Sequence, residues 1–241
     1  MKTTSAGRRD FYITTAFLAL VLAWDFSGLD MRVMRLFGGA TGFAERDSLW
    51  ASTLVHSGGR WLAWLLAAAL AVVALRTPKA ARGAPGRTER LGWLGVMLLC
   101  ALAVPALKRL SATSCPWDLA EFGGMARYVS HWQWGLADGG PGHCFPAGHA
   151  IAAYAFFGMY FLWRGHDPRR ARAWLLGVLA AGVLFGIGQL VRGAHYPSHT
   201  LWSAWICWAI CAGADGLRRV ISVLRAPAPA STLLAHPAPP S

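Results

Sequence analysis

Charged residues are scarce in this chain of 241 residues, and acidic residues are the scarcest. Asp, Glu, Lys and Arg together make up 14% of the sequence, against about 25% in ordinary soluble domains. There are 11 acidic residues and 23 Lys or Arg, so the net charge is +12, and hydrophobic residues reach 55%. This composition excludes a disordered chain. It also argues against a soluble nucleic-acid binder, because the basic residues occur in short groups between long apolar runs.

Cysteine is sparse as well, which excludes a disulfide-rich secreted scaffold. Of the five cysteines, Cys100, Cys207 and Cys211 fall inside apolar runs and are interpreted as small apolar residues. Cys115 and Cys144 lie together in one polar loop. An oxidising compartment would permit a bridge between them, and we favour this disulfide over two free thiols. In the chain-entropy model such a crosslink contributes about 3–4 kcal/mol.

What the chain has instead is a series of apolar segments near the length of about 20 residues that crosses a bilayer. We predict an all-α fold, a polytopic membrane helix bundle with six transmembrane helices in one domain, residues 1–225. The Pro/Ala-rich residues 226–241 are predicted to be a disordered cytoplasmic tail. The first segment is interpreted as a retained span rather than a cleaved signal peptide. The six predicted spans are 11–28, 61–75, 91–107, 150–163, 173–191 and 200–217.

The distribution of charge predicts the orientation, because Lys and Arg gather on the cytoplasmic side of short loops. With the N-terminus inside, the inner segments hold 15 of the 23 basic residues and a net charge of +11, and the outer segments a net charge of +1. We therefore expect a multi-pass membrane protein with both termini in the cytoplasm. The loop 108–149 and the turn 189–199 would then face outward.

Three polar clusters lie in these outward segments, and polar groups at membrane depth suggest a site. Proline is favoured at the first position of a helix, so Pro146 and Pro197 predict two helix starts. Free N–H groups and the positive end of the dipole favour an anion there. The clusters are Lys108-Arg109 with Cys115-Pro116-Trp117-Asp118, Cys144-Phe145-Pro146-Ala147-Gly148-His149, and Gln189 with Arg192-Gly193-Ala194-His195-Tyr196-Pro197-Ser198-His199.

Two histidines of the third cluster suggest nucleophilic chemistry. A nucleophilic imidazole needs one free nitrogen and an acceptor that holds the other. A neutral His199, four residues after His195, would be that acceptor. The same spacing also allows zinc on a helix, but Pro197 between the two histidines weakens that geometry. We expect no metal and no other cofactor.

In this order the clusters resemble the type-2 phosphatidic acid phosphatase superfamily, whose motifs are Lys-x6-Arg-Pro, Pro-Ser-Gly-His and Ser-Arg-x5-His-x3-Asp. The chain departs from them at Cys115, at Gly188-Gln189 and at His199, which stand where the family has Arg, Ser-Arg and Asp. It is most similar to a divergent bacterial branch of membrane-associated members. The matching stretches are Lys108-x6-Cys115-Pro116, Pro146-Ala147-Gly148-His149 and His195-x3-His199.

The resemblance implies a metal-independent integral hydrolase of the bacterial inner membrane, with its site facing the periplasm. It would act on a lipid-linked phosphate monoester or pyrophosphate through a phosphohistidine. His195 would be the nucleophile, His149 the general acid, and His199 the residue in the position of the family's Asp. The implied partners are a lipid phosphate and the bilayer, with no nucleic acid. A lipid phosphotransferase, or a catalytically weak binding or transport protein that keeps the fold, are the alternatives. The expected phosphate-binding residues are Lys108, Arg192, Arg109 and Gly148.

Overall fold

The computed structural model describes residues 2–79, 83–133 and 135–225, so the predicted tail 226–241 lies outside the described residues. The described chain is mostly helical, as predicted, with one antiparallel pair of two-residue strands. Its long helices are α1 (Lys2–Phe26), α3 (Gly59–Arg76), α4 (Arg87–Leu110), α7 (Pro168–Val191) and α8 (Pro197–Leu224). The shorter elements are α2 (Leu29–Met34), β1 (Gly38–Gly39), β2 (Gly42–Phe43), the π-helix η1 (Leu49–Gly58), the 3-10 turns η2 (Pro116–Asp118), η3 (Ala120–Phe122) and η4 (Gly148–Ala150), α5 (Ile151–Tyr154) and α6 (Phe157–Trp163).

Every predicted span falls on helical structure, but two differ in form. The second begins earlier, because η1 runs directly into α3 and makes one helical stretch, Leu49–Arg76. The fourth is divided at Ala155 and Phe156 into the short helices α5 and α6. All seven residues of α6 are buried. A helix that is apolar on every side belongs in a protein interior, so α6 is the centre of the bundle.

Three helical stretches of the described chain are long and apolar enough to cross a membrane by length and composition. They are Leu49–Arg76, α4 and α7. Three of the six predicted transmembrane helices are therefore supported as candidate spans.

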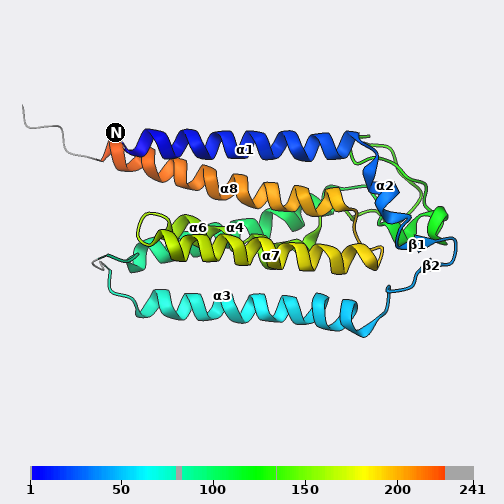
Figure 1. Ribbon diagram of the computed structural model, residues 1–241, viewed down its shortest axis with the longest axis horizontal. Helices are drawn as coiled ribbons and strands as arrows, with labels where there is room; N and C mark the ends of the chain where they lie inside the picture. Colours follow the sequence, from blue (N-terminus) through cyan, green and yellow to red (C-terminus); the bar gives the residue numbers. More distant parts are fainter. Residues whose placement is uncertain (1, 80–82, 134, 226–241) are drawn as a thin grey trace, which may run out of the picture.

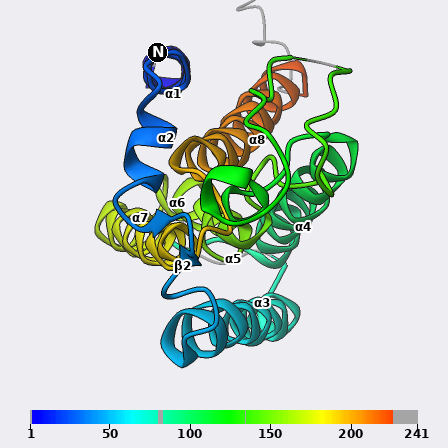
Figure 2. The same cartoon turned by 90° about the vertical axis from the view of Figure 1, so that its right-hand side faces the viewer.

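The long helices lie side by side along the longest axis of the molecule (Figure 1). Within the bundle α1 packs against α8, α3 against α4, and α6 against α4, α7 and α8. Seen end-on, α3 lies at the margin of the bundle, away from α1 (Figure 2). The main apolar core joins α4, α5, α6 and α8 through buried residues such as Trp93, Tyr154, Phe157, Cys207 and Trp208.

Buried ion pairs fasten the end of the bundle where α1 begins. The Arg164 guanidinium donates to both oxygens of Asp10, at 2.8 and 2.7 Å, and to Asp215 at 2.6 Å. Arg219 bonds both carboxylates as well. Two charges of each sign compensate one another, as buried ions require. The network fixes α1 to α8 and to the end of α6.

At the opposite end of the bundle, the carboxylates of Asp25 in α1 and Asp30 in α2 accept hydrogen bonds from the start of α8. Asp25 accepts a hydrogen bond from Trp202 Nε1 at 2.7 Å. Asp30 in α2 accepts from the backbone N–H of Ser198 at 3.0 Å and from the Ser198 hydroxyl. Trp24 Nε1 also donates to Asp30, at 2.8 Å. The chain between α4 and η4, the β1–β2 pair and the turn 192–196 all lie at this end (Figure 1).

Candidate active site

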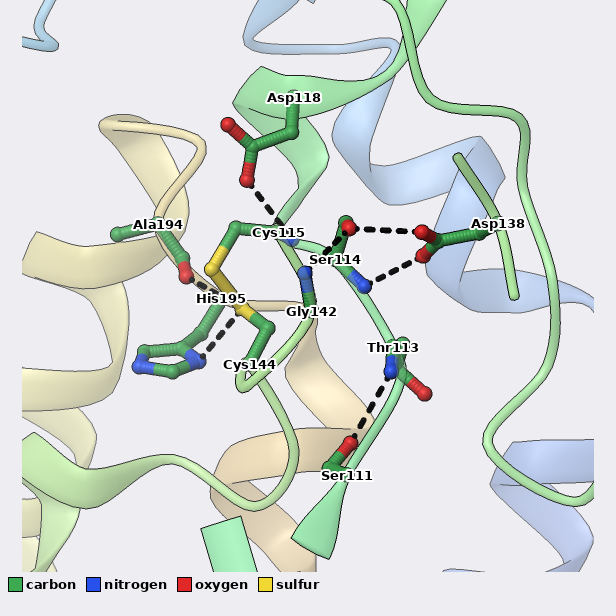
Figure 3. Close-up of a disulfide and its surroundings, with 10 residues drawn as sticks. All are labelled: Ser111, Thr113, Ser114, Cys115, Asp118, Asp138, Gly142, Cys144, Ala194 and His195. Atoms are coloured by element: carbon green, nitrogen blue, oxygen red, sulfur yellow. Dashed lines mark hydrogen bonds between the residues drawn. A yellow bond between two sulfur atoms is a disulfide. The ribbon is translucent and has the colours of Figure 1, made fainter. Parts of the chain in front are cut away.

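The loop after α4 is folded back on itself by a buried carboxylate. Asp138 accepts from the Ser114 N–H at 2.6 Å, the Ser114 hydroxyl at 2.9 Å and the Gly140 N–H at 2.9 Å. The Cys144 N–H donates to the Thr113 carbonyl at 2.9 Å. These bonds bring the two ends of the loop side by side, with Cys115 facing Cys144 (Figure 3).

A disulfide joins Cys115 to Cys144, with an S–S distance of 2.02 Å. The Trp117 N–H, two residues on, donates to the Gly193 carbonyl at 2.9 Å and so ties the loop to the turn before α8. Gly193 has a φ of +72°, and a Cβ there would lie 2.3 Å from the Phe43 ring. Only glycine suits this position, since it combines a left-handed backbone with no room for a side chain.

The imidazole of His195 lies next to this disulfide. Its side chain is buried, and Nδ1 is 3.4 Å from Cys144 Sγ (Figure 3). Burial lowers the pKa of His195 well below its ordinary value, and the nearby charge of Lys108 lowers it further. Hydrogen bonding to the Cys144 backbone raises the pKa but does not outweigh burial. The imidazole is therefore neutral at neutral pH, which is the form a nucleophile requires.

The other two predicted catalytic histidines flank His195. The His149 ring, in η4, has its centroid 6.0 Å from that of His195. The His199 ring, in the first turn of α8, is 5.9 Å from it. No hydrogen bond joins His199 to His195 in the described chain, and His199 Nδ1 is buried without a hydrogen-bond partner there. The prediction that His199 accepts a hydrogen bond from His195 is therefore wrong, because Nδ1 of His195 faces Cys144 instead.

A cavity of about 470 Å³ lies between α3, α4, α5 and α7, and it is lined by His149 but not by His195. Its polar groups are near the loop end of these helices and include Lys108, Gly148, His149 and Gln189. Most of the remaining wall is apolar, so the cavity has the mixed character of a ligand site with few polar groups. Its apolar wall includes Ala63, Trp64, Leu94, Leu98, Phe156 and Phe185.

Lys108 supplies positive charge at the polar end. Its side chain is half-buried, and no acidic group pairs with it among the residues that the structure describes. A Cβ added to Gly148 would lie 3.8 Å from Lys108 Nζ. A side chain at position 148 would therefore occupy the space beside the ammonium group, which glycine leaves open.

The structure does not bring the two predicted arginines to this cavity. Arg192 Nε donates to the Arg46 carbonyl at 2.8 Å, and its guanidinium lies 5.7 Å from the centre of the Trp117 ring. Arg109 is exposed near the end of α4. Neither lines the cavity, whereas Arg60 of α3 does.

The predicted helix starts are also only partly correct. Pro197 is the first residue of α8, as expected. Asp30 accepts the Ser198 N–H, however, so a carboxylate already takes one of the free N–H groups at this helix start. Pro146 precedes η4 rather than beginning a helix, and the Ala147 N–H donates to the His199 carbonyl at 3.1 Å. That the two segments are aimed at one anion stays a prediction.

Gln189 is a site residue whose role the motifs did not predict. It is buried, it lines the cavity, and neither atom of its amide has a hydrogen-bond partner in the described chain. A buried polar group without a partner is costly, so a ligand group in the cavity is its natural partner. The preceding Gly188 is enforced by packing, because a Cβ there would lie 2.7 Å from Val55.

One group of metal-ligand type lies at the site. The sulfurs of Cys115 and Cys144 and a ring nitrogen of His195 all lie within 4.8 Å of one another. Metals bind cysteine as thiolate, and here both sulfurs are bonded to each other. In its disulfide form this group does not fit a metal ion.

Comparison with family models gives a match to the PAP2 superfamily over residues 90–216, which is more than half of the chain. The chain belongs to the PAP2 superfamily. The match confirms the family inferred from the motifs, and its range contains Lys108, His149 and His195. PAP2 members are phosphatases, which supports a phosphoester hydrolase in general terms. No curated protein and no solved structure matched the chain.

Proposed function

We propose that the protein is an integral membrane phosphatase that hydrolyses a lipid-linked phosphate ester through a phosphohistidine intermediate. The observation that carries the proposal is the cavity, since a largely apolar channel ends at Lys108, His149 and Gln189. The apolar chain of a lipid would contact the apolar wall formed by α3 and α4, and its phosphate would bind at the end of the cavity that carries Lys108.

The cavity also has a lateral side. Two of its lining residues, Trp64 on α3 and Leu98 on α4, are 60% and 54% exposed. These side chains therefore belong both to the cavity wall and to the outer surface of the bundle. This favours a lipid that enters between the helices over a small phosphate ester taken from water.

In the first chemical step His195 Nε2 attacks phosphorus while the bond from phosphorus to the ester oxygen breaks. Protonated His149 gives its proton to the leaving oxygen. Lys108 and the Gln189 amide bind the phosphoryl oxygens, since phosphoryl transfer depends mainly on positioning and charge stabilisation. In the second step neutral His149 removes a proton from water as the water attacks phosphorus. The P–N bond breaks and inorganic phosphate leaves.

We further propose six spans, with both termini in the cytoplasm and the active site on the periplasmic side. The start of α1, the end of α3, the start of α4, the 164–167 turn and the end of α8 share one end of the bundle (Figure 1). The basic residues assigned to the inside belong to these helix ends or to the short sequences that connect them. The disulfide and the three histidines are at the other end, and an oxidising periplasm allows a disulfide to persist.

The test is phosphate release by purified protein in detergent, with a lipid phosphate and a short soluble phosphate monoester as substrates. We expect release from the lipid, unchanged by EDTA and abolished by His195→Ala. Labelled phosphate that appears on a second lipid instead of in solution would identify a phosphotransferase. Full activity of the His195→Ala variant would overturn the assignment of the nucleophile.

A further inference from the structure

His195 needs a group that fixes its tautomer, and the structure offers an unusual one. A neutral imidazole carries its proton on one of two nitrogens, and the partner of the first nitrogen decides which is free. In the described chain no carboxylate hydrogen-bonds His195, and His199 does not bond to it either. The side-chain contact of Nδ1 is Cys144 Sγ at 3.4 Å, beside the hydrogen bonding of the ring to the Cys144 backbone.

A disulfide sulfur has no proton, so it can accept a hydrogen bond but cannot donate one. The contact between Nδ1 and Cys144 Sγ is therefore a hydrogen bond only if Nδ1 carries the proton. The same sulfur lies 3.1 Å from the Ala194 carbonyl oxygen, which also has no proton. In the described part of the chain, neither of these two groups can donate a proton to Nδ1.

We propose that the disulfide sulfur of Cys144 is a positioning group for His195, which accepts the Nδ1–H and leaves Nε2 free to attack phosphorus. This inference rests on the proposed function, because it assigns the group behind the proposed nucleophile. Sulfur then takes the orienting part that a carboxylate has elsewhere in the family. An active site is therefore compatible with His199 at the position where the family has Asp.

The sulfur is held firmly enough for this task. Cys144 is fully buried, bonded covalently to Cys115, and fixed through its own N–H to the Thr113 carbonyl. The adjoining Ser114 is held by the Asp138 carboxylate. A weak acceptor placed this rigidly restricts the ring at little entropic cost, which is the general advantage of preorganised sites.

Two double variants separate positioning from crosslinking. Cys115→Ala/Cys144→Ser and Cys115→Ala/Cys144→Ala both lack the disulfide and both keep the Cys144 backbone. They share the backbone contact and differ in one side-chain acceptor beside Nδ1, which is a hydroxyl in the first variant and is absent from the second. We expect equal melting temperatures, equal KM, and a kcat about tenfold lower for the alanine variant, the change that one modest hydrogen bond makes. Equal kcat values would overturn the proposal.

A measurement on the wild type decides the same question without activity. We expect 15N spectra of the histidines, with His195 assigned from a His195→Asn variant, to show protonated Nδ1 and unprotonated Nε2. The opposite tautomer in the wild type would overturn the positioning role. If the protein releases no phosphate, the proposed function fails, and the spectrum still tests the role of the sulfur. If phosphate is released and the wild type shows the expected tautomer, both stand.

Discussion

At the scale of single residues, the site combines buried polar groups with very few counter-charges. His195 and Gln189 are both 2% exposed. Neither has a carboxylate partner in the described chain, and the nearby charge of Lys108 acts against protonation of His195. In such a site the His195 imidazole stays neutral, and the Gln189 amide would find its hydrogen-bond partner in the proposed anionic ligand.

The lowered pKa of His195 predicts the pH dependence of the first chemical step. Neutral imidazole is the reacting form, and burial favours it in the folded protein. The rate of phosphoenzyme formation should therefore persist as the pH falls below about 6.5, the ordinary histidine value. Rapid-quench measurement with an activated aryl phosphate tests this, because its leaving oxygen needs little protonation. Loss of the rate at or above that pH would contradict the lowered pKa.

Gln189 gives a second test at this scale. Gln189→Leu removes both amide groups and nearly preserves volume, so the lipid phosphate should bind about tenfold more weakly, as expected for one or two lost hydrogen bonds. Steady-state kinetics would show a higher KM. Arg192→Ala is the matched control. Its guanidinium contacts the Arg46 carbonyl and Trp117 rather than the cavity, so KM should change little.

The motifs indicated which histidines and which lysine would meet, but they did not indicate the supporting contacts. Spacing along a helix start placed His149 and His195 correctly near one site. It could not show that Arg192 would turn toward Trp117, because that contact depends on the fold of the loop between α4 and η4. The contact of Cys144 with His195 joins residues 51 positions apart and leaves no local pattern.

At the scale of elements, the start of α8 depends on a carboxylate from α2. Asp30→Ala should lower the stability of the folded protein by about 1–2 kcal/mol, the usual cost of a lost helix cap. Asp30→Asn keeps an acceptor for the Ser198 N–H and should lose less. Thermal unfolding in detergent measures both. An unchanged melting temperature for Asp30→Ala would mean that water or another group caps α8 equally well.

The elements themselves were mostly predictable, because long apolar runs have few alternatives to helix. The exceptions have physical reasons. Residues Ser52, Thr53, Ser57 and Gly58 interrupt the apolar pattern before α3, yet they form η1, which packs against α7. Ala155 and Phe156, where α5 and α6 separate, are apolar residues of the main core. The hydropathy of the sequence therefore did not indicate a break there.

At the scale of the whole molecule, the charge asymmetry predicts which end of the bundle faces the cytoplasm. A reporter fused after Arg225 should read as cytoplasmic, and one inserted at Gly139 as periplasmic. Paired alkaline phosphatase and fluorescent protein fusions give readouts of opposite sign. Inverted readouts at both positions would place the disulfide in the cytoplasm and remove the proposed orientation.

If the proposed lipid enters at the exposed side of the cavity formed by α3 and α4, that route would also determine which concentration the enzyme responds to. A substrate that enters sideways is delivered by diffusion in two dimensions, so the relevant quantity is its mole fraction in the surface. Added detergent in mixed micelles should then slow turnover of a lipid phosphate at constant bulk concentration, whereas a chainless monoester should show no such surface dilution. Trp64 and Leu98 line the cavity and are exposed on the outside of the bundle, so on this proposal the rate of turnover would depend on the density of the lipid in the membrane.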